Sequence, residues 1–102
     1  MTIDDEAIAA VECHPAVRSV RLVGSRATGT PTAWSDWDFA VETDDFEEVA
    51  RDLGSLLDAL HPLAQQWDRL SETWCWMVIV PGPTKLDYIF AQPHEREPPW
   101  QI

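Results

Sequence analysis

The chain has 102 residues, 45% of them hydrophobic and 25% charged, which is an ordinary composition for one globular domain. Its formal net charge of −11 at pH 7 argues against nucleic acid as a partner, because proteins that bind phosphates usually carry a basic surface. No apolar run approaches the ~20 residues that span a bilayer, and the acidic first residues do not resemble a signal peptide, so we expect a cytoplasmic protein without membrane contact.

At the N-terminus, the sequence predicts a helix over residues 2–13. Thr2 can cap this helix, apolar residues recur along it at helical spacing, and Pro15 ends it. β-Branched residues then predict a strand over 17–23. A clean alternation of polar and apolar residues predicts a second strand over 36–41.

The clearest predicted element is a helix over residues 46–60, where apolar residues recur at helical spacing. Asp44 can cap this helix, with Glu47 three residues further on in a capping-box arrangement, and Pro62 ends it. Gly54 weakens the helix by about 1 kcal/mol relative to alanine, and this cost is too small to change the prediction of a helix here.

Three further strands are predicted over 64–70, 73–80 and 84–91, and a Pro-Gly-Pro turn predicts that the last two form an antiparallel hairpin. Residues 92–102 are rich in proline and have no periodicity, so we expect an extended or disordered tail after a domain over residues 1–91. The sum is an α/β (α+β) fold with a mixed sheet of about five strands and two main helices.

Apolar residues occupy both faces of the predicted strand over 73–80, and Trp74, Trp76, Val78 and Val80 share one of them. A strand of this kind needs cover on both faces. We prefer packing in the core of one chain, because large exposed apolar patches are rare. The alternative is that some of these tryptophans form a subunit interface.

Two aspartates open the predicted strand over 36–41. Because strand side chains alternate, Asp36 and Asp38 point to one face, and the apolar Trp37 and Phe39 point to the other. The two acids lie ~6.5 Å apart along the backbone, close enough to converge on one or two cations, and without a cation at least one pKa should rise. Taken alone, the pattern is common, and both acids can instead face solvent at a sheet edge.

Gly24 and Ser25 follow the predicted strand over 17–23. Glycine permits the close approach of a ligand to the backbone, Ser25 offers a hydroxyl donor, and the amides of the following turn can face an anion. Ordinary turn chemistry also explains a lone Gly-Ser pair. Beside the aspartates, however, the pair predicts a phosphate-holding loop next to a metal-holding strand, which is what a magnesium nucleotide requires.

These residues together resemble the signature of the polymerase-beta-like nucleotidyltransferase superfamily, especially its minimal nucleotidyltransferases. The resemblance rests on Gly24-Ser25, ten intervening residues and Asp36-Trp37-Asp38, and it is strengthened by Gly29 and Ser35. The family also expects a third carboxylate on a later apolar strand, and the segment TKLDYIF supplies Asp87. The implied fold has helices on one face of a mixed sheet and the metal site on the other.

The resemblance also implies roles for individual residues. Asp36 and Asp38 would hold two Mg²⁺ ions, and Asp87 would complete the acceptor-side metal site and help to deprotonate the attacking hydroxyl. Gly24 and Ser25 would hold the phosphates of a nucleoside triphosphate. Arg26, next to that pair, and Lys85, on the face of Asp87, are weaker candidates for triphosphate contacts, and both could be ordinary solvated charges.

The implied function is Mg²⁺-dependent transfer of AMP from ATP to a hydroxyl. The acceptor is expected on a partner protein, as in an antitoxin-like enzyme that modifies a small helical toxin, or on a small molecule such as an aminoglycoside. No acceptor-binding helical domain is expected after Ala91, which points to a partner chain or a homodimer cleft. The alternative is a non-catalytic nucleotide- or partner-binding module, although three repelling carboxylates have no use in a pure binder.

Overall fold

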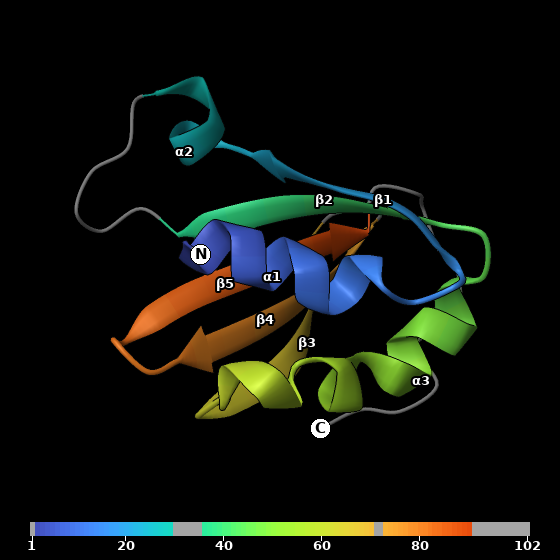
Figure 1. Cartoon of the computed structure of the whole chain (residues 1–102). Helices are drawn as coiled ribbons and strands as arrows, with labels where there is room; N and C mark the ends of the chain where they lie inside the picture. The colour runs from blue at the N-terminus through green and yellow to red at the C-terminus, as the bar shows by residue number, and fades with distance from the viewer. Residues whose placement is uncertain (1, 30–35, 71–72, 91–102) are drawn as a thin grey trace.

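The computed structural model describes residues 2–29, 36–70 and 73–90 (Figure 1). It contains two longer helices, one short helix, a 3-10 turn and five strands. In chain order these are α1 (Ile3–Glu12), β1 (Val17–Val23), α2 (Ser25–Thr28), β2 (Trp37–Thr43), α3 (Phe46–Leu56), η1 (Asp58–Leu60), β3 (Ala64–Leu70), β4 (Thr73–Val80) and β5 (Thr84–Phe90).

The five strands form one mixed sheet in the order β1-β2-β5-β4-β3. β2 and β5 run parallel at its centre, and the three other neighbouring pairs are antiparallel. β5 therefore lies between two antiparallel ribbons, β1–β2 and β3–β4. Its parallel pairing with β2 places Asp38 directly opposite Asp87.

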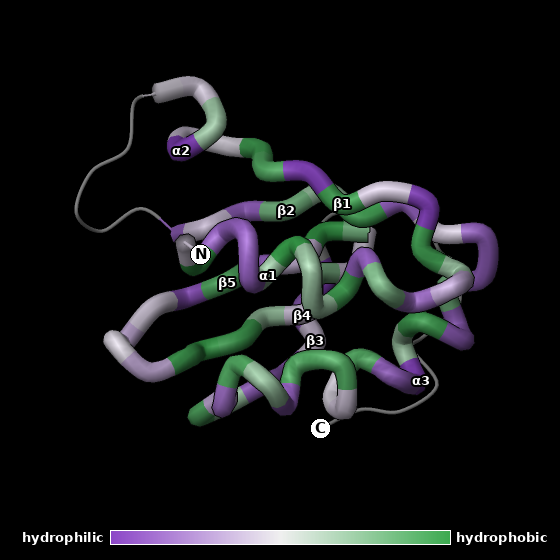
Figure 2. Tube along the Cα trace, in the orientation of Figure 1, coloured by the Kyte–Doolittle hydropathy of each residue, from purple (hydrophilic) through white to green (hydrophobic). Residues whose placement is uncertain are grey.

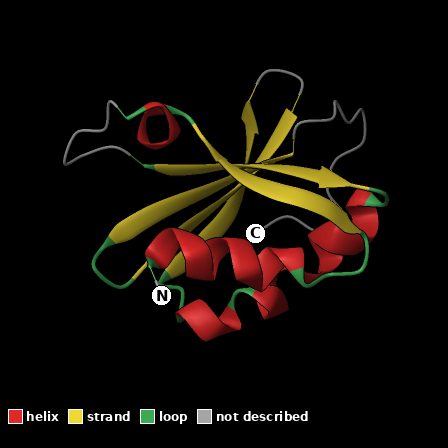
Figure 3. Ribbon diagram, turned by 45° about the horizontal axis from the view of Figure 1, so that its top comes forward, coloured by secondary structure: helices red, strands yellow, loops and turns green. Residues whose placement is uncertain are grey.

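Helices α1 and α3 pack on the same face of the sheet (Figure 3). Hydrophobic residues recur along the central strands that they cover (Figure 2), and Phe39, Trp76 and Tyr88 are completely buried there. The Tyr88 ring stacks on Phe39 with a centroid distance of 5.3 Å, and its hydroxyl donates a 2.8 Å hydrogen bond to the Ala7 carbonyl oxygen in α1. No described helix is long and apolar enough to cross a membrane.

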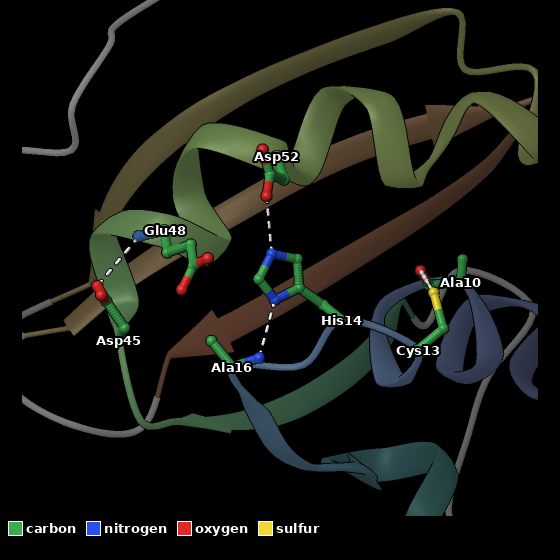
Figure 4. A network of polar contacts seen from close by, with 7 residues as sticks. All are labelled: Ala10, Cys13, His14, Ala16, Asp45, Glu48 and Asp52. Atoms are coloured by element: carbon green, nitrogen blue, oxygen red, sulfur yellow. Dashed lines mark hydrogen bonds and ion pairs between the residues drawn. The ribbon is translucent and has the colours of Figure 1, made fainter.

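His14 links the end of α1 to α3 (Figure 4). Its Nδ1 accepts a 3.0 Å hydrogen bond from the backbone N–H of Ala16, and its Nε2 lies 2.8 Å from Asp52 Oδ2 in α3. Because Nδ1 is the acceptor, Nε2 carries the proton, and this N–H donates a hydrogen bond to the carboxylate of Asp52. The sequence predicted no role for His14, since the contact with Asp52 depends on tertiary packing.

The fold confirms most of the predicted elements, including the five-stranded mixed sheet and the antiparallel pairing of β4 with β5. The predicted cap of the second long helix is wrong by one residue. Asp45, and not Asp44, accepts the backbone N–H of Glu48, at 3.1 Å. Asp44 still belongs to the preceding segment, because its N–H is bonded to the Ala16 carbonyl oxygen at 2.8 Å.

Two predicted boundaries also move. The helix expected over 46–60 ends at Leu56, and the chain tightens into η1 before His61 reverses it with a φ of 54°. The strand expected over 36–41 extends to Thr43, because β1 pairs Val17 with that residue. The tail predicted over 92–102 lies outside the described residues.

The tryptophans of β4 belong to the helix-covered face. Trp76 and Val78 are completely buried and Val80 almost so, which confirms core packing for this part of the strand, whereas Trp74 is only partly buried. Trp67 from β3 lies 4.9 Å from Trp76 and 6.2 Å from Trp74 between ring centroids, and it also contacts Phe46 at the start of α3. The aromatic rings thus join the β3 edge of the sheet to α3.

Candidate active site

Gly24 brings the loop after β1 against Asp38. Val23, the last residue of β1, pairs with Asp38 across the antiparallel ribbon, and Gly24 follows with a φ of 76°. A Cβ atom at Gly24 would lie 2.6 Å from Asp38 Oδ2, so any side chain there would displace the carboxylate. Glycine adopts this φ without strain and leaves the carboxylate in place. The predicted loop and the predicted acid are therefore in direct contact.

The three predicted acids meet on the sheet face opposite α1 and α3. Asp38 and Asp87 are paired across the parallel strands β2 and β5, and each alternates with residues that face the core. Asp36 precedes β2 and reaches the same place, since Lys85 on β5 contacts both Asp36 and Asp87. Two segments far apart in the sequence thus supply one group of carboxylates.

Lys85 lies between two of these acids. Its Nζ is 3.2 Å from Asp36 Oδ2 and 3.3 Å from Asp87 Oδ2. The lysine side chain is 32% exposed, whereas that of Asp87 is only 11% exposed. The ammonium group therefore balances part of the negative charge of the site.

The carboxylates differ in burial, since the Asp87 side chain is almost buried and that of Asp36 is 39% exposed. Burial raises the pKa of Asp87 to about 6, against the lowering effect of Lys85 and with a further rise from Asp36 and Asp38. Burial is also the main cause of the raised pKa of Asp38. Burial acts to lower the pKa of Lys85, but its hydrogen bonds and charge interactions with Asp36 and Asp87 outweigh this effect and raise it. The predicted rise in at least one pKa of the pair is found at Asp38, where repulsion by Asp36 contributes less than burial.

The donor set fits a hard divalent cation such as Mg²⁺, which prefers carboxylate oxygens. Asp87 Oδ1 is buried and has no hydrogen-bond partner among the described residues, and such an atom is costly unless something offsets its lost hydration. Within residues 2–29, 36–70 and 73–90, no three His, Cys, Asp or Glu side chains are grouped closely enough to hold a metal ion. Lys85 instead stands between Asp36 and Asp87, where a cation would bind.

The loop residues predicted to hold phosphates lie beside these acids. Ser25 and Arg26 begin α2. The backbone N–H groups of Ala27 and Thr28 close its first turn by donating hydrogen bonds to the Gly24 carbonyl oxygen. The Arg26 guanidinium lies over the Trp37 ring, 4.2 Å from its centroid, in a cation–π contact. Trp37 alternates with Asp36 and Asp38 at the start of β2 and packs against the core on the helix-covered face, so this contact does not bring the guanidinium to the acids. Ser35, the last residue before Asp36, lies outside the described part of the chain.

This combination of loop, strands and acids matches a known domain family. The model of the nucleotidyltransferase domain matches residues 6–91, which include the Gly-Ser loop, the three acids and all five described strands. The chain belongs to the nucleotidyltransferase domain family. The family to which the Gly-Ser and Asp-x-Asp pattern pointed is thereby confirmed.

Solved structures with a similar fold include a cytoplasmic RNA terminal U-transferase (18% identity, TM-score 0.63), the polymerase core of TRAMP, an RNA surveillance complex (15%, 0.66), and the Cid1 poly(U) polymerase (14%, 0.62). Each covers 88% of this chain, but the chain spans only 27%, 31% and 28% of theirs. At these identities the likeness shows the fold. No curated protein matches the chain in sequence.

Two features of the site were missed from the sequence. Alternation placed Lys85 on the face of Asp87, but its contact with Asp36 depends on the parallel pairing of β2 with β5, which no local pattern predicts. Cys75 on β4 shares this face and is 2% exposed, and burial raises its pKa. It therefore remains a thiol at neutral pH and is unsuited to act as a nucleophile.

Proposed function

We propose that the chain is a Mg²⁺-dependent nucleotidyltransferase that moves AMP from ATP to an acceptor hydroxyl. The observation that carries this proposal is the meeting of Gly24, Asp38 and Asp87 at one point of the sheet. A loop that suits phosphates and carboxylates that suit a divalent cation are together what one magnesium nucleotide needs. Membership of the family supplies the class of reaction.

The acids carry the chemical step in this proposal. Asp36, Asp38 and Asp87 would hold Mg²⁺, two ions by the family resemblance, and the bound metal would neutralise charge that develops in the transfer step. Asp87 takes the proton of the acceptor hydroxyl, the acceptor oxygen forms a bond to the α-phosphorus, and pyrophosphate leaves. The burial of Asp87 supports this role, because a carboxylate shielded from water is a stronger base.

The loop after β1 binds the triphosphate. Gly24, which has no side chain, leaves room for phosphate oxygens against the backbone, and Ser25 donates its hydroxyl. Arg26 adds a positive charge next to this pair, and its guanidinium must leave its contact with Trp37 to reach the phosphates. These three residues bind and orient the nucleotide and take no part in proton transfer.

We place the acceptor hydroxyl on a partner protein, as in a toxin–antitoxin pair, with a small molecule such as an aminoglycoside as the other candidate. The net charge of −11 favours both over RNA, whose phosphates it repels. The chain spans less than a third of the similar structures. We propose that a helical partner or a second copy of the chain completes the acceptor site. The proposed location is the cytoplasm, which contains ATP and Mg²⁺.

The test compares the wild type with Asp38→Ala and, as a matched control, Asp68→Ala, which removes an exposed acid from β3. Calorimetry measures Mg²⁺-dependent binding of a nonhydrolysable ATP analogue. Mass spectrometry follows the addition of AMP to a co-expressed helical partner, an aminoglycoside and an RNA 3′ end. We expect Asp38→Ala to lose binding and transfer with its fold intact, and Asp68→Ala to retain both. Full activity of Asp38→Ala would contradict the assignment of the acids.

The same experiment separates the proposal from its alternative, a non-catalytic binding module. Such a module would bind its partner or the nucleotide without modifying any acceptor, and its partner affinity would not change in Asp38→Ala. A mass increase of one AMP on any acceptor, absent with Asp38→Ala, excludes it.

A further inference from the structure

Lys85 occupies the place that the proposed function gives to a divalent cation. Its ammonium contacts Asp36 Oδ2 at 3.2 Å and Asp87 Oδ2 at 3.3 Å, which is longer than the about 2.7–2.9 Å of a strong charge-assisted hydrogen bond. One oxygen of each carboxylate is thus already engaged by a cation that belongs to the protein. Lys85 is also the only lysine in the sequence.

The ammonium and a divalent cation cannot share these oxygens. Two positive ions within a few ångströms of each other, in a site partly shielded from water, repel strongly. Mg²⁺ also requires its carboxylate ligands at about 2.0–2.1 Å in near-octahedral geometry, which leaves no room for an ammonium between them. Lys85 must therefore leave its position when the cation binds.

The surroundings of Lys85 allow this movement. Its side chain is 32% exposed, so a path to solvent is open, and its four-carbon stem is flexible. The protein without metal gains from the contact, because Lys85 offsets repulsion among the acids and the cost of burying Asp87. The described polar contacts of the ammonium are thus its two carboxylate partners.

We propose that Lys85 is an exchangeable counter-ion of the active site, which pairs with Asp36 and Asp87 when the site is empty and is displaced by the divalent cation. This inference rests on the proposed function, because it assumes that the acids bind metal. The exchange weakens cation binding, since each binding event must break the two lysine contacts. Between catalytic cycles the two lysine contacts stabilise the group of acids, so Lys85 is a positioning residue.

The first test measures the affinity for Mn²⁺ alone, with and without a nonhydrolysable ATP analogue. Lys85→Met keeps the apolar stem and removes the competing charge. Arg21→Met is the matched control, because exposed Arg21 lies on β1 opposite Ala40, on the face of the acids, and its loss changes the net charge equally. A neighbouring charge changes the proton affinity of a carboxylate by tenfold or more. We therefore expect Lys85→Met to bind Mn²⁺ about tenfold more tightly, and Arg21→Met to stay within about twofold of the wild type.

The second test uses the wild type, so it does not depend on whether Lys85→Met folds. With one lysine in the chain, ¹³C-methylated Lys85 gives one side-chain NMR signal besides that of the N-terminal amine. Saturating Mg²⁺ should move this signal to the position of a solvated lysine, and the rate of acetylation of Lys85, followed by mass spectrometry, should increase.

The outcomes separate the inference from the proposed function. Equal Mn²⁺ affinity of the wild type and Lys85→Met, or a lysine signal that does not change when the cation binds, overturns the counter-ion inference and leaves the metal site standing. An equal gain in Arg21→Met also overturns it, because the effect is then one of net charge. Absence of cation binding by every protein, with and without the analogue, overturns the proposed function together with the inference.

Discussion

Replacing Asp87 by asparagine should change how the stability of the metal-free protein depends on pH. Burial raises the pKa of Asp87 from 3.8 to about 6, so the fold favours its protonated form. The stability that this group contributes is fully present below about pH 4 and is lost as the pH rises through 6. A shift of about 2 pKa units corresponds to about 3 kcal/mol. The amide of Asp87→Asn does not titrate, so the variant should keep this stability at pH 7.5.

The assay is urea denaturation in the presence of a chelator between pH 4 and pH 7.5. The free energy of unfolding of Asp87→Asn minus that of the wild type should increase by most of about 3 kcal/mol across this range. Asp68→Asn, which removes an exposed acid, should run parallel to the wild type. Added Mg²⁺ should restore stability to the wild type at pH 7.5 and not to Asp87→Asn. A stability difference that is constant with pH would refute the claim that the site holds Asp87 as a poorly hydrated carboxylate.

Two further predictions follow from contacts of Gly24 and His14 in the structure. Gly24→Ala should lose about 1–2 kcal/mol of stability through its positive φ and, by displacing Asp38, at least about a hundredfold in transfer activity. In the same denaturation assay the control Gly54→Ala, whose added Cβ meets nothing within 4 Å, should gain up to about 1 kcal/mol. Transfer by Gly24→Ala at the wild-type rate would contradict the contact with Asp38. His14→Ala should lose about 2 kcal/mol by leaving a buried N–H and Asp52 without their partner, with unchanged Mn²⁺ affinity, and an unchanged unfolding midpoint would show that the link between α1 and α3 contributes nothing.

The sequence predicted the strands because local chemistry determines them. Alternation placed Asp36 and Asp38 on one face and Phe39 on the other, and the same argument placed Asp87 with Lys85. Alternation could not say that β5 pairs with β2, because a strand carries no local signal of its neighbour. That adjacency was expected only from the resemblance to the family, and it is the pairing that creates the site.

The errors have tertiary causes. Asp44 and Asp45 are equally good caps, and the choice between them depends on the bond from the Asp44 N–H to the Ala16 carbonyl oxygen, across 28 residues of sequence. The bridging of Asp36 by Lys85 likewise joins residues 49 positions apart. A local sequence pattern can predict neither contact, because each joins residues that are far apart in the chain.

The place of β5 in the sheet has a consequence for how the protein is made. β5 is the last described strand in the chain, yet it lies between β2 and β4 and supplies both Asp87 and Lys85. While the chain emerges from the ribosome, the earlier strands can form only the two separate ribbons β1–β2 and β3–β4. In the nascent chain, Asp87 and Lys85 therefore cannot join Asp36 and Asp38 until synthesis has passed Phe90 and β5 has paired with β2 and β4.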